Sequence, residues 1–168
     1  MTAGFPADNP WGDRQLDESN EMLIGIIDEG VSFSNSPSFE YEYSNTGYAL
    51  LAEIVARVSG TSFKDFMQER VFEPLGMQQS SFTGNRNALI PGRAASYYPD
   101  GDTFKNIIVA GEAIGSTGLY TTALDLLKWA KNFETQDVGK RAVFDMMTER
   151  FSTPSGEVST FAKGHELR

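Results

Sequence analysis

Apolar residues recur with a helical period in several parts of the chain, most clearly over residues 46–59. Four aliphatic residues there fall at i, i+3, i+4 and i+7, so they share one face of a helix. They are Leu51, Ile54, Val55 and Val58. Neighbouring alanines and a further leucine widen this face, and charged residues are few. The pattern predicts a helix that is largely buried.

A second helix is predicted to follow directly. Gly60 is placed to end the first helix, because glycine readily adopts the left-handed conformation of a helix C-terminus. Ser62 and Asp65 have the spacing of an N-terminal capping box, and Pro74 marks the far limit. The expected apolar side of this second helix consists of Phe63, Phe66, Met67 and Val71.

Weaker patterns predict the remaining elements. A helix is expected to begin at Thr121 or Thr122, where Asp125 can complete the cap. Its predicted apolar face consists of Ala123, Leu126, Leu127 and Ala130. Further helices are predicted over residues 17–29 and 139–151, strands over 94–98 and 106–110, a strand or frayed tail over 152–168, and loops over 1–16 and 32–42.

Composition narrows the class of protein. The 168 residues, 40% of them hydrophobic and 12% aromatic, are typical of one globular domain or part of a larger one. The net charge of −9 disfavours nucleic acids and anionic membrane surfaces as partners, and no apolar run is long enough for a transmembrane helix. Without cysteine there is no disulfide, thiolate metal site or cysteine nucleophile. The single histidine, His165, lies near a terminus beside charged residues and is interpreted as solvated.

The segment over residues 41–48 carries the most chemistry. Tyr43 and Asn45 lie just ahead of the predicted buried helix, on what would be a rigid rim. A tyrosine can act as a general base where a neighbouring cation lowers its pKa from about 10, and an asparagine can hydrogen-bond that cation or a substrate amide. The alternative is structural: Asn45 caps the helix and Tyr43 packs on its first turn. Spacing alone favours the structural interpretation.

Four segments of the chain favour the catalytic interpretation of Tyr43 and Asn45, because they match a known family in the family's own order. They are Thr2–Phe5 with Asp8–Leu16, Tyr43-Ser-Asn45 with Thr46–Ile54, Phe72-Glu-Pro-Leu-Gly-Met77, and Gly115–Trp129. Together they resemble the serine β-lactamase and penicillin-binding protein superfamily, in its class C-like branch with related esterases and D-amino-acid peptidases. The resemblance covers most of the chain. It implies that Tyr43 and Asn45 belong to the second catalytic box of that family.

The chain departs from the family in two places. The nucleophile of the family lies in a Ser-x-x-Lys box, and no serine here has a lysine three residues later. Thr61-Ser-Phe-Lys64 and Thr160-Phe-Ala-Lys163 come near, but a threonine stands in the serine position of each. The third box, a His or Lys followed by a small residue and glycine, is also missing. We therefore expect residues 1–168 to be an internal part of a longer hydrolase domain, without a nucleophile of its own; the alternative is a degenerate homologue that binds and does not cut.

The resemblance implies a fold and an activity. The fold is α+β, an antiparallel sheet flanked by helices, and this chain would cover mainly the helical subdomain, with more helix than strand and an apolar face left bare. The activity is acyl transfer through an acyl-enzyme on a β-lactam, a D-Ala-terminated peptide or a small ester, with no metal or organic cofactor. The competing class is a non-catalytic helical module that binds a ligand or a partner. Substrate, compartment and oligomeric state stay open.

Overall fold

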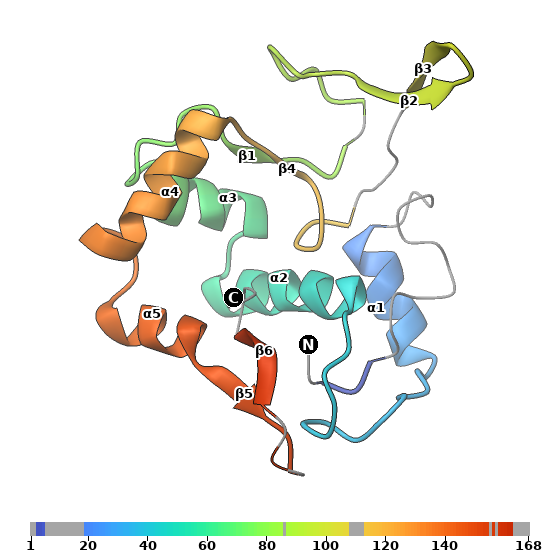
Figure 1. Ribbon diagram of the computed structural model, residues 1–168, viewed down its shortest axis with the longest axis vertical. Coiled ribbons are helices and arrows are strands. Elements are labelled where there is room, and N and C mark those ends of the chain that lie inside the picture. Colours follow the sequence, from blue (N-terminus) through green and yellow to red (C-terminus); the bar gives the residue numbers. More distant parts are fainter. Residues whose placement is uncertain are drawn as a thin grey trace.

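The computed structural model describes residues 3–5, 19–85, 87–107, 113–154, 156 and 158–162. Its helices are α1 (Asn20–Asp28), α2 (Asn45–Ser59), α3 (Phe63–Met67), the π-helical turn η1 (Gln68–Phe72), α4 (Ala123–Thr135) and α5 (Arg141–Thr148). Its strands are β1 (Ser81–Phe82), β2 (Ser96–Asp100), β3 (Thr103–Ile107), β4 (Leu119–Tyr120), β5 (Arg150–Ser152) and β6 (Val158–Ala162). Helix exceeds strand, as expected, and the strands form three antiparallel pairs, β1–β4, β2–β3 and β5–β6 (Figure 1). No described helix is both long and apolar enough to cross a membrane.

Local capping chemistry sets the helix ends near the centre of the chain. Gly60 has a left-handed φ of +73° and its N–H donates to the Ala56 carbonyl, which ends α2 as predicted. The Ser62 hydroxyl oxygen accepts the Asp65 N–H at 3.1 Å, which confirms the predicted cap of α3. The helix continues through η1 and its last residue precedes Pro74, as expected, although its second half has widened to π geometry.

The first helix begins later than predicted. Ser19, in an extended conformation, accepts the Met22 N–H at 3.4 Å and serves as the N-cap of α1. The expected start at residues 17–18 lies outside the described residues, as do the expected loop at residues 6–16 and His165. Residues 32–42 form no helix or strand, which confirms the predicted loop.

An aromatic cluster forms the main core. Phe72, Met77 and Phe82 are buried there, and the rings of Phe63 and Phe82 meet edge to face with centroids 5.1 Å apart. The partly buried side chains packed against this cluster are Phe63, Met67, Val71, Leu75, Ile114 and Trp129. Three of the four residues predicted on the apolar side of the second helix therefore reach the core.

The prediction that the helix over residues 46–59 is largely buried was wrong. Helix α2 buries Ala49 and Ala52, but Leu51 and Ile54 are each 54% exposed and Val58 is 84% exposed. The predicted apolar face of α4 (Ala123, Leu126, Leu127 and Ala130) is likewise exposed, and the fully buried positions of that helix are Asp125 and Asn132. The physical reason is the same in both helices. Periodicity identifies residues that share a face, but no described element covers these aliphatic faces.

The two predicted strands form a hairpin, shifted by a few residues. Strands β2 and β3 pair in register from Ser96↔Ile107 to Asp100↔Thr103, and Gly101 in the connecting turn has a φ of +60°. The expected strand residues 108–110 lie outside the described part. Every side chain in β2 and β3 is exposed, and Figure 1 shows the hairpin projecting away from the helices.

The C-terminal region also ends its helix early. Helix α5 stops at Thr148 instead of residue 151, because the chain turns extended at Glu149 and β5 pairs with β6. The prediction of a strand in the last segment is confirmed for residues 158–162.

Candidate functional site

The N-terminus of α2 is capped by Ser44, not by Asn45. Ser44 is extended, with φ −148° and ψ 111°, and its Oγ accepts the Gly47 N–H at 3.1 Å. Asn45 is already the first residue of the helix. The structural alternative that Asn45 serves as the cap was therefore wrong.

Tyr43 and Asn45 are hydrogen-bonded to each other. The Tyr43 hydroxyl donates to Asn45 Oδ1 at 3.0 Å. Tyr43 is 42% exposed, whereas Asn45 is only 6% exposed. The asparagine is thus held within the helix end, and it fixes the hydroxyl of a tyrosine that is itself partly exposed. The two residues singled out from the sequence do lie together in the structure.

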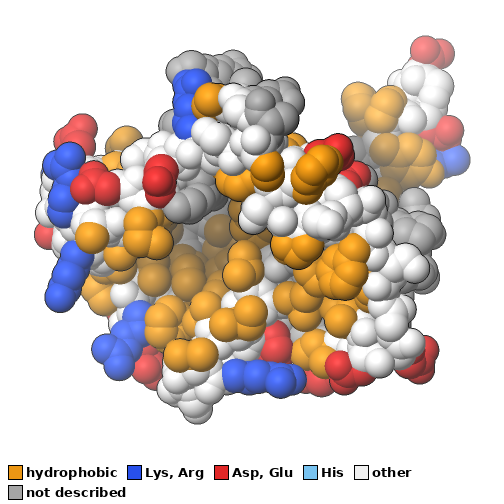
Figure 2. Space-filling model, turned by 90° about the horizontal axis from the view of Figure 1, so that it is seen from below, with side chains coloured by type: hydrophobic (Ala, Val, Ile, Leu, Met, Phe, Trp, Pro, Cys, Tyr) orange, Lys and Arg blue, Asp and Glu red, His pale blue; other side chains and the backbone are white. Residues whose placement is uncertain are grey.

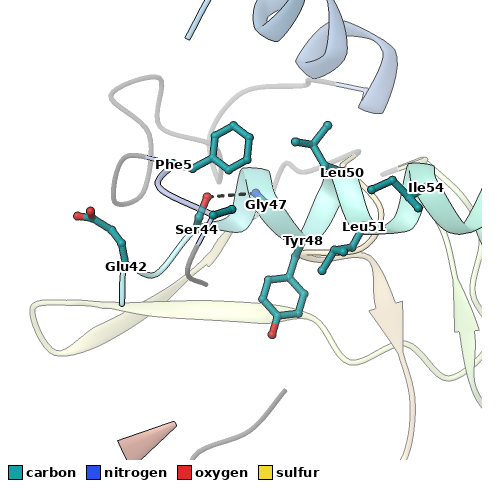
Figure 3. A pocket seen from close by; sticks show the side chains of 9 residues that line it. Phe5, Glu42, Ser44, Gly47, Tyr48, Leu50, Leu51 and Ile54 are labelled. Carbon is teal, nitrogen blue, oxygen red and sulfur yellow. Dashed lines mark hydrogen bonds between the residues drawn. The ribbon is translucent and has the colours of Figure 1, made fainter. Parts of the chain in front are cut away.

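A cavity of about 320 Å³ lies along α2 and begins at its N-cap, Ser44. It is lined by Ala3, Phe5, Glu42, Ser44, Gly47, Tyr48, Leu50, Leu51 and Ile54. Figure 3 shows Phe5 and Leu50 on one side of the α2 ribbon and Tyr48 and Leu51 on the other, with Gly47 between them. Tyr43 and Asn45 do not line it. This cavity was not predicted from the sequence. The pattern that could have indicated it is a pair of small residues, Ser44 and Gly47, just before two leucines.

The glycine-rich turn at residues 113–118 packs on the other side of α2. Gly115 has a φ of +114°, and a Cβ there would lie 2.6 Å from Ala52 Cβ and 2.7 Å from the Tyr48 carbonyl oxygen. The side chain of Asn20 donates to the Ile114 carbonyl at 3.1 Å and ties α1 to the same turn. Helix α2 is therefore fixed from this side by close backbone contact.

A buried carboxylate joins α4 to the segment that follows η1. Asp125 is 1% exposed and accepts the Gln79 N–H at 2.7 Å, the Ser80 hydroxyl at 3.0 Å and Lys128 Nζ at 2.7 Å. The hydrogen bond from Lys128, with those from Gln79 and Ser80, lowers the pKa of Asp125 although burial opposes this. The Asp125 N–H also donates to Thr122 Oγ1 at 3.2 Å, which confirms the predicted cap.

These partners were not predicted. The sequence placed Asp125 only in the helix cap. Its side chain in fact contacts Gln79 and Ser80, which lie 46 and 45 positions earlier in the chain. All three donors bind the Asp125 carboxylate, and Lys128 also donates to the Gly76 carbonyl. We interpret these contacts as structural, because they hold α4 against the segment that follows η1. In the part of the chain that the structure describes, no three His, Asp or Glu side chains lie together in a way that could hold a metal ion.

Comparison with known proteins gives this geometry a context. The chain is 30% identical over 111 residues to the D-alanyl-D-alanine-carboxypeptidase/endopeptidase AmpH of Escherichia coli K12, covering 64% of this chain and 26% of AmpH. It is 30% identical over 170 residues to the lovastatin esterase of Penicillium rubens, covering 92% of this chain and 42% of that enzyme. This chain thus spans less than half the length of either relative.

The fold has solved counterparts. The octameric penicillin-binding protein homologue from Pyrococcus abyssi superposes with a TM-score of 0.75 at 22% identity, over 97% of this chain and 40% of that one. The likeness confirms the expected penicillin-binding-protein-like fold. The Beta-lactamase family model matches residues 1–167. Because that match covers nearly the whole sequence, the chain belongs to the Beta-lactamase family.

Proposed function

We propose that these residues form part of a serine hydrolase that acts through an acyl-enzyme on a β-lactam, a D-Ala-terminated peptide or a small ester. Membership of the family supports the reaction class, and relatives named for peptide and for ester hydrolysis support both kinds of bond. The nucleophile would come from sequence outside these 168 residues, so this chain alone would be inactive. The non-catalytic homologue stays as the competing hypothesis.

One observation carries the assignment of roles. The Tyr43 hydroxyl is held at 3.0 Å by a buried asparagine that the helix does not need as a cap, because Ser44 performs that task. A hydroxyl held in a fixed position on a half-exposed tyrosine suits proton transfer, since a general acid or base must be held within hydrogen-bond reach of the reacting group. Tyr43 is thus the proton shuttle, and Asn45 the residue that orients it and a substrate polar group.

The proposed reaction needs a serine nucleophile from sequence outside these 168 residues. Its Oγ attacks the carbonyl carbon while its proton passes to the Tyr43 oxygen, the base of this step, and backbone N–H groups stabilise the tetrahedral oxyanion. Collapse breaks the C–N or C–O bond, and the leaving group takes the proton through Tyr43. A water molecule then attacks the carbonyl carbon of the acyl-enzyme and passes its proton to the Tyr43 oxygen, which has given its own proton to the leaving group. The ester C–O bond breaks, and this proton moves on to the serine Oγ, which releases the acid and the free serine.

The first test concerns this chain by itself. We expect no hydrolysis of nitrocefin or p-nitrophenyl acetate above background, and no serine labelling by a fluorophosphonate probe. Stoichiometric labelling of any serine would contradict the supplied nucleophile, and Ser44 would then be examined first. The DNA on either side of the coding region is read for an in-frame Ser-x-x-Lys box, and its absence on both sides favours the non-catalytic homologue.

The second test uses the longer protein that such a frame encodes. Tyr43→Phe should reduce turnover by roughly 10²–10⁴-fold, the range expected for a lost general acid or base. The control is Tyr97→Phe, because Tyr97 lies on the exposed hairpin and is 61% exposed. Turnover within about threefold of wild type for Tyr43→Phe would make the tyrosine structural.

Asn45→Asp separates orientation from folding. The carboxylate can still accept the Tyr43 hydroxyl, and a negative charge at the first residue of α2 suits the helix dipole, so stability should change little. The variant cannot donate a hydrogen bond, and we expect turnover to fall at least about a hundredfold. Full activity in this variant would remove Asn45 from the site.

A further inference from the structure

The main-chain groups of the β2–β3 hairpin alternate in direction in a way that its register fixes. A two-residue turn connects the strands, so the flanking residues Asp100 and Thr103 form a hydrogen-bonded pair. Such pairs alternate with non-hydrogen-bonded ones along an antiparallel ladder, which makes Pro99↔Phe104 a non-hydrogen-bonded pair. The lack of an N–H in proline agrees with this assignment. The main-chain groups of this pair therefore point away from the partner strand.

The two outer edges of the hairpin differ. In β2 the outward positions are Tyr97 and Pro99, and proline has no N–H to donate. In β3 they are Phe104 and Asn106, each with an N–H and a carbonyl directed outward. Among the described strands, β2 and β3 pair only with each other. The β3 edge is thus the one that a further strand can join with a full set of hydrogen bonds.

The side chains divide between the two faces of this ribbon. Residues that pair across the ladder share a face, so Pro99 and Phe104 lie side by side, with Tyr97 on the same face. Phe104 is 74% exposed and Tyr97 is 61% exposed. The opposite face carries an ion pair between Lys105 and Asp100. Exposed aromatic side chains gathered beside an open strand edge indicate an interaction surface.

The β3 edge is self-complementary in one two-fold arrangement. When two β3 strands pair antiparallel, outward residues face outward residues, so the axis passes through Phe104, Lys105 or Asn106. An axis at Lys105 sets two ammonium groups directly opposite each other, which is unfavourable. An axis at Asn106 sets Lys105 beside Ile107 of the other copy, without a carboxylate nearby. An axis at Phe104 sets the two Phe104 rings opposite each other.

The arrangement with its axis at Phe104 also matches charge. Lys105 then lies opposite Thr103 of the other copy, and the next residue across that ribbon is Asp100. Each ammonium group is therefore near a carboxylate of its own hairpin and a carboxylate of the other. On the opposite face, Pro99 and Phe104 of both copies form one continuous apolar row.

We propose that the β3 edge binds the β3 edge of a second copy of this chain, about a two-fold axis at Phe104. The two hairpins form a single sheet in the order β2–β3–β3–β2. The contact area is small and the net charge of −9 opposes association. We therefore expect a weak dimer that forms at roughly 10–100 μM protein. This inference does not depend on the proposed hydrolase function.

The chain has no cysteine, so introduced thiols report the register of the pairing. Position 103 of one copy should lie opposite position 105 of the other, with Cα atoms about 4.5 Å apart and within disulfide range. Thr103→Cys and a tagged Lys105→Cys chain are oxidised at about 100 μM, separately and mixed. We expect the mixture to form a mixed disulfide at least about tenfold faster than either variant alone forms its own. Tyr97→Cys, on the far edge of the ribbon, is the control and should not cross-link with either variant.

Matched glutamate variants test which surface brings the copies together. Figure 2 shows hydrophobic side chains gathered over a hollowed face of the molecule, which offers a second surface for association. Phe104→Glu and Val58→Glu each add one negative charge, at side chains that are 74% and 84% exposed. In sedimentation velocity, the first should weaken dimerisation by at least about tenfold and the second should leave it unchanged, with circular dichroism confirming that both fold. A chain that stays monomeric at about 100 μM, equal effects of the two variants, or self-cross-linking of Lys105→Cys faster than cross-linking of the mixture would each overturn the proposal.

Discussion

Replacing Gly115 by alanine should destabilise the chain more than its backbone conformation alone explains. Gly115 and Gly30 have nearly the same φ, +114° and +113°, but a Cβ at Gly30 has nothing within 4 Å. Both alanine variants carry the strain of a left-handed conformation, about 1–2 kcal/mol. Only the Gly115 variant places a methyl group 2.6 Å from Ala52 Cβ and 2.7 Å from the Tyr48 carbonyl oxygen. Overpacking of that kind adds about 1–3 kcal/mol.

Urea denaturation followed by circular dichroism measures this difference. Gly115→Ala should lose about 1–3 kcal/mol more than Gly30→Ala at a similar m-value. Adding Ala52→Gly should recover part of the excess, because it removes one of the two closest atoms. Equal losses in the two alanine variants would show that the turn does not press on α2, and the described support of the helix would be wrong.

Three further outcomes follow from the contacts. Ser44→Ala should cost about 0.5–2 kcal/mol in urea denaturation and Ser44→Gly less, as for an N-cap. Asn132→Ala should cost about 1–3 kcal/mol and speed amide exchange at Val138, whose N–H and carbonyl both bond to the Asn132 side chain at 2.9 Å. The folded-state pKa of Asp125 is lowered, so its charge stabilises the fold above the unfolded value of about 3.9 and that contribution is lost as the pH falls through the folded value. The melting temperature of Asp125→Asn should therefore lie below wild type near neutral pH and approach it below about pH 4; a gap that stays constant with pH would contradict the charged contact.

Helix ends were predictable wherever the deciding interaction is local. Gly60, Ser62 and Thr122 act within three or four residues of themselves, and the sequence displays both partners. The α2 cap was less clear, because Ser44, Asn45 and Thr46 can all serve as caps and composition does not choose among them. The extended backbone at Ser44 makes the choice.

Burial and long-range contacts were not predictable from these patterns. The aliphatic period of α2 identified a shared face, but whether anything covers Leu51 and Ile54 depends on other elements. The role of Asp125 depends on Gln79 and Ser80, which approach it only after η1 and β1 have packed. The proximity of Tyr43 and Asn45 was within reach of the sequence, since the two are only two residues apart.

The three strand pairs share no strand among the described residues, so each pair is stabilised only by the hydrogen bonds between its own two strands and by its own packing. A two-stranded ribbon is marginally stable by itself, and β2–β3 adds no buried side chain to strengthen it. The amide hydrogens of the hairpin should therefore exchange with solvent through local opening. Those around Ala49 and Ala52 should exchange only through global unfolding. Such a gap in protection would let the hairpin change shape without disturbing the helix that carries Tyr43 and Asn45.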